Sequence, residues 1–290
     1  TTLEFTSPQV RHPKLKVLSG TVALELDQFP KDHEIEVSTP TAVCGAVGTR
    51  FEISYSGEDK VLGIDKANAQ LNQSFHCSKG EIYVKTDSFH IGRIGKGQQV
   101  VTESHEGSEN SYCSVELKNE AGKQSFHIVL ADKSEFTALK GTSFEIARPK
   151  VQQGDENISV VKINDRNMNN LDFFTEAELP VKPGNSYVKV GGKFIVNKNT
   201  DAYLLAAREE GQLDTRVKEL DLKVAMNEKV NVVALQQERI KLVAKRHAAA
   251  KKATLIFQKI HQHRMIRQVI QSVRKNIRLQ QMRNMRNNRR

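Results

Sequence analysis

The chain has 290 residues, of which 38% are hydrophobic and 6% aromatic, and it contains no Trp. This composition is that of a globular protein with a lean core. The sequence contains no run of 18 or more apolar residues, so it predicts no membrane-spanning helix. Thr1 already belongs to a strand-like pattern with no signal segment before it, so we expect the natural chain to begin further upstream.

Charge divides the chain into an acidic body and a basic tail. Lys and Arg total 44 against 34 Asp and Glu, a net charge of +10. From Arg239 to Arg290 there are 16 basic residues and no acidic one, so the preceding 238 residues carry 28 basic against 34 acidic residues, a net charge of −6. Such basic blocks attract polyanions, namely nucleic acid, anionic lipid or an acidic protein face.

The three cysteines, Cys44, Cys77 and Cys113, show no Cys-x-x-Cys spacing. They allow one disulfide and leave an odd thiol, so no disulfide framework is expected. Cysteine usage therefore does not indicate the compartment.

Apolar and polar residues alternate in short runs up to about Asn199, as at Ile35/Val37 and Phe51/Ile53. Gly, Pro, Asn, Asp and Ser separate these runs. Alternation with a period of two predicts half-buried strands of an all-β region.

From about Asp201 the apolar spacing becomes helical, and neither Pro nor Gly occurs after Gly211. A single helix to about Arg283 would be roughly 120 Å long at about 1.5 Å per residue. Because the stripe loses register near 227–233, we expect a break there. The stripe begins with Leu213, Val217, Leu220 and Val224.

The β region contains an internal repeat. Residues 33–53 align with 126–146 at an offset of 93, which superposes two occurrences of the sequence GTxFEI. Further along, 80–85 resembles 184–189 after eleven inserted residues. We therefore expect two copies of one β unit, the second more diverged.

The segment 37–53, VSTPTAVCGAVGTRFEI, resembles the signature of the FecR domain family, a Thr-Pro-x-Ala-x-x-Gly-x-x-Gly-Thr-x-Phe-x-Val pattern. The flanks agree with the family as well. LSGTV at 18–22 resembles its upstream strand, and GEIYV at 80–84 with IGKGQQV at 94–100 resembles its closing strands. The resemblance covers about 1–101 and, less closely, the second copy.

The resemblance implies a non-catalytic protein of the cell envelope. Better-known members of the FecR family lie in the periplasm, sense an outer-membrane receptor and signal to a sigma factor through a cytoplasmic segment and one membrane span. This chain contains neither of these, and it has Val47 and Lys140 where the family has Arg, so sigma-factor control is not expected. An extracytoplasmic β domain that binds a protein partner, such as an envelope receptor or regulator, is expected, with no small-molecule substrate.

The residues of the FecR motif are expected to have structural roles. Gly45 and Gly48 permit tight turns or a positive φ, and Pro40 suits a strand start or an edge. Phe51 and Ile53 are expected to be buried on one face of a strand. The motif residues are Thr39, Pro40, Gly45, Gly48, Thr49, Phe51, Ile53, Gly141, Thr142, Phe144 and Ile146.

Candidate catalytic and metal sites are weak. His76 and Cys77 are strand neighbours that point to opposite faces, and His261 and His263 do not face each other on a helix. The glycines at 95–97 are not followed by the helix that a phosphate-binding loop needs, so a turn is expected. We expect no enzyme activity, no metal site and no cofactor.

Three interpretations of the basic tail stay open. It is a solvated helix that keeps the protein soluble or docks on the acidic body, a polyanion-binding segment, or a self-associating helix with a short seam at Val233, Ile240 and Val243. Phe257 is its only aromatic residue after Arg239, which disfavours stacking on single-stranded nucleic acid. The candidate polyanion-binding residues are Lys245, Arg246, Lys251, Lys252, Arg264, Arg267, Arg274, Lys275 and Arg278.

We therefore predict a mostly β protein with tandem roll-like or sandwich-like FecR units at 1–101 and 102–199, followed by a long basic helical region at 200–290. The expected function is that of a non-catalytic signalling or scaffold protein of the periplasm or cell envelope, whose β domains bind a protein partner. The alternative is a polyanion-binding protein that acts through its basic C-terminal helices on nucleic acid or an anionic envelope polymer.

Overall fold

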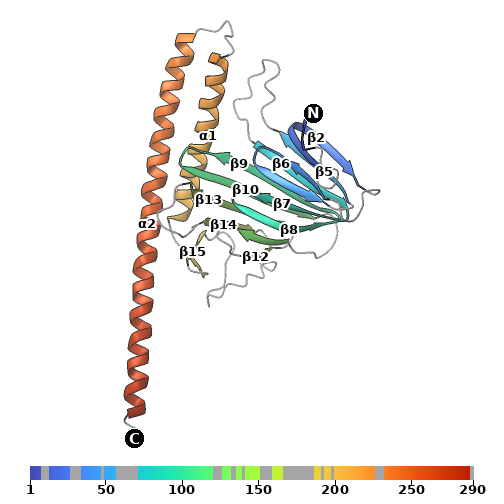
Figure 1. The fold of residues 1–290 in the computed structure, drawn as a ribbon. Coiled ribbons are helices and arrows are strands. Elements are labelled where there is room, and N and C mark those ends of the chain that lie inside the picture. Colours follow the sequence, from blue (N-terminus) through green and yellow to red (C-terminus); the bar gives the residue numbers. More distant parts are fainter. Residues whose placement is uncertain are drawn as a thin grey trace.

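Strands and helices occupy separate parts of this computed structural model. The structure describes residues 1–7, 13–26, 34–46, 49–56, 71–119, 126–131, 135–138, 141–150, 159–165, 186–190, 193–196, 199–225 and 232–287. The described residues before 197 form strands and those from 200 onward form helices (Figure 1). The predicted mostly β protein with C-terminal helices is confirmed.

The strands are β1 (Thr2–Ser7), β2 (Lys14–Glu25), β3 (Ile35–Ser38), β4 (Ala42–Ala46), β5 (Arg50–Ser56), β6 (Leu71–Lys79), β7 (Glu81–Thr86), β8 (Phe89–Gly95), β9 (Gln98–Glu106), β10 (Asn110–Asn119), β11 (Phe126–Leu130), β12 (Glu135–Ala138), β13 (Thr142–Pro149), β14 (Val160–Asp165), β15 (Ser186–Val190) and β16 (Lys193–Val196). Together they form the β body.

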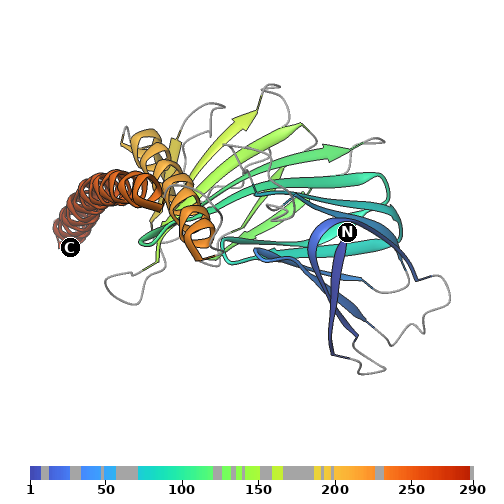
Figure 2. The ribbon, with the colours of Figure 1, turned by 90° about the horizontal axis from the view of Figure 1, so that it is seen from above.

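One continuous sheet curls at β2 into two facing layers. Its order is β12-β11-β8-β7-β4-β3-β2-β5-β6-β9-β10-β13-β14-β15-β16, with β1 paired to β2 outside this path. The first residues of β2 pair with β3 in parallel, and its later residues pair with β5 antiparallel. The long strand β2 therefore belongs to both layers, which are seen from above in Figure 2.

A single apolar core fills the space between the layers. Phe51 and Ile53 from β5 and Phe144 and Ile146 from β13 are each at most 1% exposed, as the alternation in the sequence predicts. The rings of Phe89 and Phe144 meet edge to face, 5.9 Å apart, and join the two layers. The predicted boundary between 101 and 102 falls inside β9, and residues from both sides of it share this core.

The two segments aligned in the sequence take related positions and then diverge. The pairs β2–β5 and β10–β13 are both antiparallel, but Val22 lies opposite Ile53 whereas its counterpart Val115 lies opposite Phe144. The register therefore differs by two residues. Later, β7 pairs with β4 and β8, whereas β15 pairs with β14 and β16.

Gly45 has a different role from the predicted turn. It lies inside β4 opposite Tyr83 of β7, and a Cβ at this position would lie 2.1 Å from the Tyr83 ring. The absent side chain leaves room for that ring. Gly141 does have a positive φ, 80°, while its counterpart in the first copy, Gly48, lies outside the described residues.

The helices α1 (Thr200–Ala225) and α2 (Val232–Asn287) pack antiparallel to each other. Because α1 ends at Ala225 and α2 begins at Val232, the predicted break near 227–233 is confirmed. The helix α1 lies against β9, β10, β13 and β14, and α2 lies outside α1 and extends well past the β body (Figure 1). Neither described helix combines the length and apolar character needed to cross a membrane.

Replacing Gly45 with Ala is expected to lower the free energy of unfolding by about 1–3 kcal/mol, because the Tyr83 ring or the strand must move. The matched control is Gly92→Ala in β8, where a Cβ would meet no atom closer than 3.8 Å. That control should change stability by no more than about 0.5 kcal/mol. Urea denaturation measures both variants, and equal losses would contradict the close packing of Tyr83 on Gly45.

Candidate functional site

The FecR-motif residues lie mainly in the core. Thr39 Oγ1, between β3 and β4, donates a hydrogen bond to Gln73 Oε1 at 2.6 Å and accepts one from the Ala42 backbone at 3.1 Å. Pro40 lies in the bend before β4. These residues hold the sheet together and present no reactive group. The buried members are Thr39, Gly45, Thr49, Phe51, Ile53, Thr142, Phe144 and Ile146.

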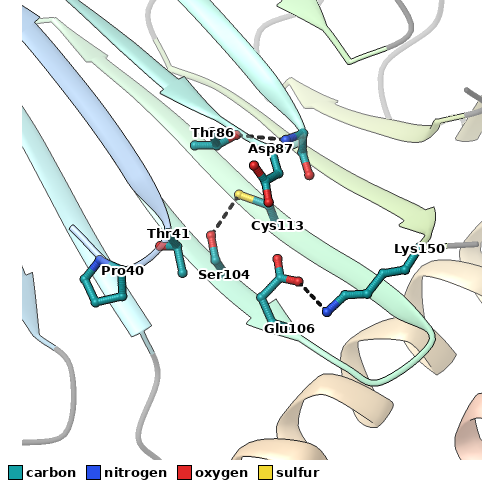
Figure 3. Close-up of a pocket in the computed structure, with 9 residues that line it drawn as sticks. Pro40, Thr41, Thr86, Asp87, Ser104, Glu106, Cys113 and Lys150 are labelled. Carbon is teal, nitrogen blue, oxygen red and sulfur yellow. Dashed lines mark hydrogen bonds and ion pairs between the residues drawn. The ribbon is translucent and has the colours of Figure 1, made fainter. Parts of the chain in front are cut away.

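A small pocket opens beside the bend that contains Pro40 (Figure 3). Its volume is about 170 Å³, below the roughly 300–1,000 Å³ of ligand pockets. Glu106 and Lys150 form an ion pair there at 2.9 Å, and burial raises the pKa of the Cys113 thiol to about 12. A protonated thiol is a weak nucleophile. The lining residues are Pro40, Thr41, Thr86, Asp87, Ser88, Ser104, Glu106, Cys113 and Lys150.

The three cysteines are buried and unpaired. Cys77 of β6 belongs to the core whereas its neighbour His76 lies on the opposite face, as predicted. Gly97, with φ 75°, makes the predicted turn between β8 and β9. Within the described residues, no three His, Cys, Asp or Glu side chains gather as metal ligands.

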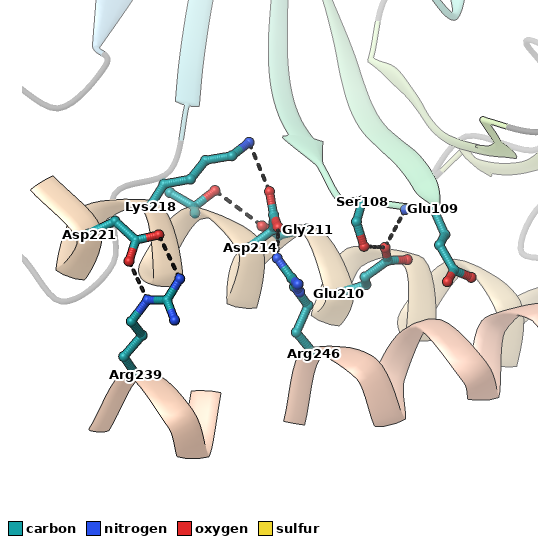
Figure 4. A network of polar contacts seen from close by, with 10 residues as sticks. Ser108, Glu109, Glu210, Gly211, Asp214, Lys218, Asp221, Arg239 and Arg246 are labelled. Carbon is teal, nitrogen blue, oxygen red and sulfur yellow. Dashed lines mark hydrogen bonds and ion pairs between the residues drawn. The ribbon is translucent and has the colours of Figure 1, made fainter. Parts of the chain in front are cut away.

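A buried carboxylate attaches α1 to the β body (Figure 4). Glu210 is 0% exposed, and its oxygens accept hydrogen bonds from Ser108 Oγ at 3.1 Å, the Glu109 backbone N–H at 2.7 Å and Asn110 Nδ2 at 2.6 Å. The hydroxyl of Tyr203 donates to Asn110 Oδ1 at 2.8 Å. Burial, reinforced by the Glu210 charge, raises the pKa of Tyr203 well above its usual value, so this donor keeps its proton.

Two glycines allow the helix to approach the strands this closely. A Cβ at Gly107, between β9 and β10, would lie 2.7 Å from the Glu210 carboxyl carbon. A Cβ at Gly211 would lie 2.6 Å from the His105 side chain and 3.0 Å from its backbone. A Gly inside a helix lowers stability by about 1 kcal/mol relative to Ala. The close approach of His105 explains why α1 has Gly at position 211.

A second polar cluster attaches α2 to α1. Asp214 is only 5% exposed and accepts bonds from Arg246 at 2.7 Å and Lys218 at 2.8 Å, while Arg239 pairs with Asp221 nearer the hairpin end (Figure 4). Burial raises the pKa of Asp214, but the bonds from Lys218 and Arg246 lower it more, so it lies below its usual value. The stabilisation is present above the unfolded-state pKa of about 3.9 and is lost as pH falls through the lower folded-state pKa.

Among the described side chains of α2, Ile260 is the last one that is buried against the rest of the protein. Ala249, Ala250, Ala253 and Ile260 are at most 4% exposed, and small side chains allow the close approach of α1. Beyond this point α2 continues over residues 261–287, which we call the distal arm. It contains seven basic residues and no acidic one.

The structure places the predicted polyanion-binding residues in different surroundings along α2. Arg246 is held by Asp214 and faces the helix pair. Arg264 and Arg267 lie on the distal arm, but their side chains are outside the described part. The remaining candidates are exposed on α2, and they are Lys245, Lys251, Lys252, Arg274, Lys275 and Arg278.

Sequence reasoning missed the attachment of the helices. Glu210 follows the i, i+3/i+4 spacing of the buried face of α1, next to Leu213 and Val217, and an acid in such a stripe together with Gly211 was the available signal. Its partners in the β9–β10 turn are about 100 residues away and could not be identified from spacing.

Comparison with protein families, with curated proteins and with solved structures found no match for this chain. The resemblance to the FecR family therefore stays a prediction.

Replacing Glu210 with Gln is expected to lower the free energy of unfolding by about 2–3 kcal/mol. The carboxylate accepts hydrogen bonds at two oxygens, whereas the Gln amide has one acceptor oxygen, so a buried donor is left unsatisfied. The matched control is Glu209→Gln, one residue away and exposed. It should shift stability by no more than about 0.5 kcal/mol. Equal denaturation midpoints for the two variants would show that Glu210 does not anchor α1.

Proposed function

We propose that this protein binds polyanions through α2, with the β body as the platform that holds the helix. The observation that carries the proposal is the distal arm, a helical segment with seven basic residues and no acid that extends past Ile260, the last buried residue among the described side chains of α2. Arg274, Lys275 and Arg278 are exposed, and no ion pair joins them to another described residue. Their charge is available to a partner.

Among the described residues, the acids that pair with basic residues of α2 lie beside its inner part. Asp214 and Asp221 pair with Arg246 and Arg239, which are close to the hairpin end. The distal arm is roughly 40 Å long at about 1.5 Å per residue, several times the Debye length of about 8 Å at physiological salt. Its outer charges are therefore screened from the body.

A line of charge on a rigid helix suits an extended anion. Arginine and lysine bind phosphate and sulfate groups through charge-assisted hydrogen bonds. The distal arm has no Phe, Tyr or Trp for stacking on bases. The expected ligand is the charged backbone of nucleic acid or an anionic envelope polymer, bound without base recognition.

The charge-removing variant Arg274→Gln/Lys275→Gln/Arg278→Gln is expected to bind heparin and duplex DNA more weakly than the parent. The slope of log K against log salt should become shallower by about 1 for each lost contact. The matched control, Lys85→Gln/Lys96→Gln/Lys118→Gln, removes the same charge from exposed positions of the β body. Fluorescence anisotropy at several salt concentrations measures both, and equal loss in the two variants would contradict binding through the distal arm.

The repeated motif supports a second proposal, that the β body is a tandem FecR-like platform of the cell envelope that binds a protein partner. Both GTxFEI segments direct their Phe and Ile into one shared core, as two packed copies of one unit would. This proposal concerns the β body and is compatible with a polyanion bound by α2.

Fractionation of native cells tests the envelope proposal. Antibody detection should find the protein with periplasmic or membrane marker proteins, because the resemblance implies an extracytoplasmic β domain. Cytoplasmic markers control for leakage. Detection in the cytosol alone would overturn this placement.

A further inference from the structure

The distal arm also carries an apolar stripe. Five aliphatic side chains on it are between 45% and 58% exposed. Their i, i+3, i+4, i+7 and i+11 spacing places them on one face, an arc roughly 100° wide at 3.6 residues per turn. They are Ile266, Val269, Ile270, Val273 and Ile277, called here the apolar stripe.

The apolar stripe faces away from the protein. The side of α2 that packs inward carries Ala253 and Ile260, which are at most 1% exposed. At about 100° per residue, the centre of the stripe lies roughly 120–140° around the helix from them. Because α2 is the outermost element (Figure 1), a flat surface can meet the stripe without meeting the β body.

We propose that the apolar stripe inserts into the surface of an anionic lipid membrane, with the distal arm lying in the plane of the interface. A helix with one aliphatic face, a basic polar face and low overall hydrophobicity binds this way. The exposed residue Arg274 follows Ile270 by four residues and so borders the stripe, and its long stem can reach the headgroups while the stripe is buried.

Charge and length argue against a second copy of this chain as the occupant. Two stripes packed together would bring two distal arms side by side, each with seven basic residues and no acid. A coiled coil also needs apolar spacing sustained over about three to four heptads, with paired charges beside the seam. The apolar stripe ends at Ile277, before Gln280 and Asn284, and spans less than two heptads.

This inference rests on the proposed function, because the same basic residues supply the attraction to anionic headgroups, but it adds a role for the apolar residues. Polyanions in solution need only the charge. A variant that loses the apolar stripe but keeps the charge therefore distinguishes membrane insertion from polyanion binding.

The test is co-sedimentation of the full chain with vesicles of phosphatidylcholine alone or mixed with phosphatidylglycerol. The variant Ile270→Gln/Val273→Gln/Ile277→Gln keeps the charge and raises helix propensity. It should bind the mixed vesicles at least about tenfold more weakly, since each buried aliphatic side chain contributes strongly. The matched control, Met265→Gln/Leu279→Gln/Met282→Gln, removes three exposed apolar residues outside the stripe and should bind like the parent.

Fluorescence gives a direct readout of insertion, because the chain has no Trp. Val273→Trp places a single indole in the apolar stripe, and Met282→Trp places one on the opposite side of the same helix. The emission of the first should shift to shorter wavelength with mixed vesicles, and that of the second should stay as in water.

Each outcome decides the proposal. Loss of vesicle binding in the stripe variant alone, with heparin binding unchanged, supports insertion. Equal vesicle binding by the stripe variant and its control, or equal binding to neutral and mixed vesicles, overturns it. Heparin binding without any vesicle binding by the parent overturns the membrane inference and leaves the proposed function standing, whereas absence of both removes the two together. Self-association of the parent that the stripe variant loses, without vesicle binding, would identify a second copy as the occupant.

Discussion

The hydrogen bonds of one buried carboxylate hold α1 against the β9–β10 turn. Glu210 accepts from a hydroxyl, a backbone amide and a side-chain amide of the β9–β10 turn, in a site from which water is excluded. A buried acid without such partners would cost several kcal/mol, so its presence in α1 is tolerated only in this docked position. Since α2 packs on α1, the direction of the distal arm also depends on this contact.

Charge is distributed along α2 according to the same geometry. Two acidic residues of α1, Asp214 and Asp221, lie where α2 runs beside them, and each holds one arginine. Past Ile260 the helix has no acid and none of its described side chains is buried, and the basic residues alternate with aliphatic ones that face outward. The inner part of the helix is thus committed to the fold, and the outer part is available for binding.

Local patterns predicted the elements but not their assembly. The alternation at Phe51/Ile53 and Phe144/Ile146 predicted buried strand faces, and the loss of helical register near 227–233 predicted the hairpin, because both depend on neighbouring residues.

Gly45 was interpreted as a turn residue because the ring that covers it, Tyr83, comes from another strand. The two-residue register difference between the β2–β5 and β10–β13 pairs could not be predicted from the sequence either, because the spacing within one strand does not specify the residues that pair with it. The basic character of α2 was evident from the sequence, whereas the split between paired Arg246 and exposed Arg274 required the contacts of Asp214.

The distal arm depends on the docked part of α2 for its helical form. An isolated helix must form its first turn at an unfavourable free energy, and short helices in water are marginal for that reason. In α2 this turn is already formed by residues that pack on α1, so each further residue adds a backbone hydrogen bond at little extra cost. The arm is rich in Arg, Gln and Met, which have good helix propensity and offset its β-branched Ile and Val. A disordered basic tail could also attract anions, but it would have to lose conformational entropy before its five aliphatic side chains shared one face. The packing of α2 on α1 therefore prepares the apolar stripe in advance, at a fixed position beside the charge.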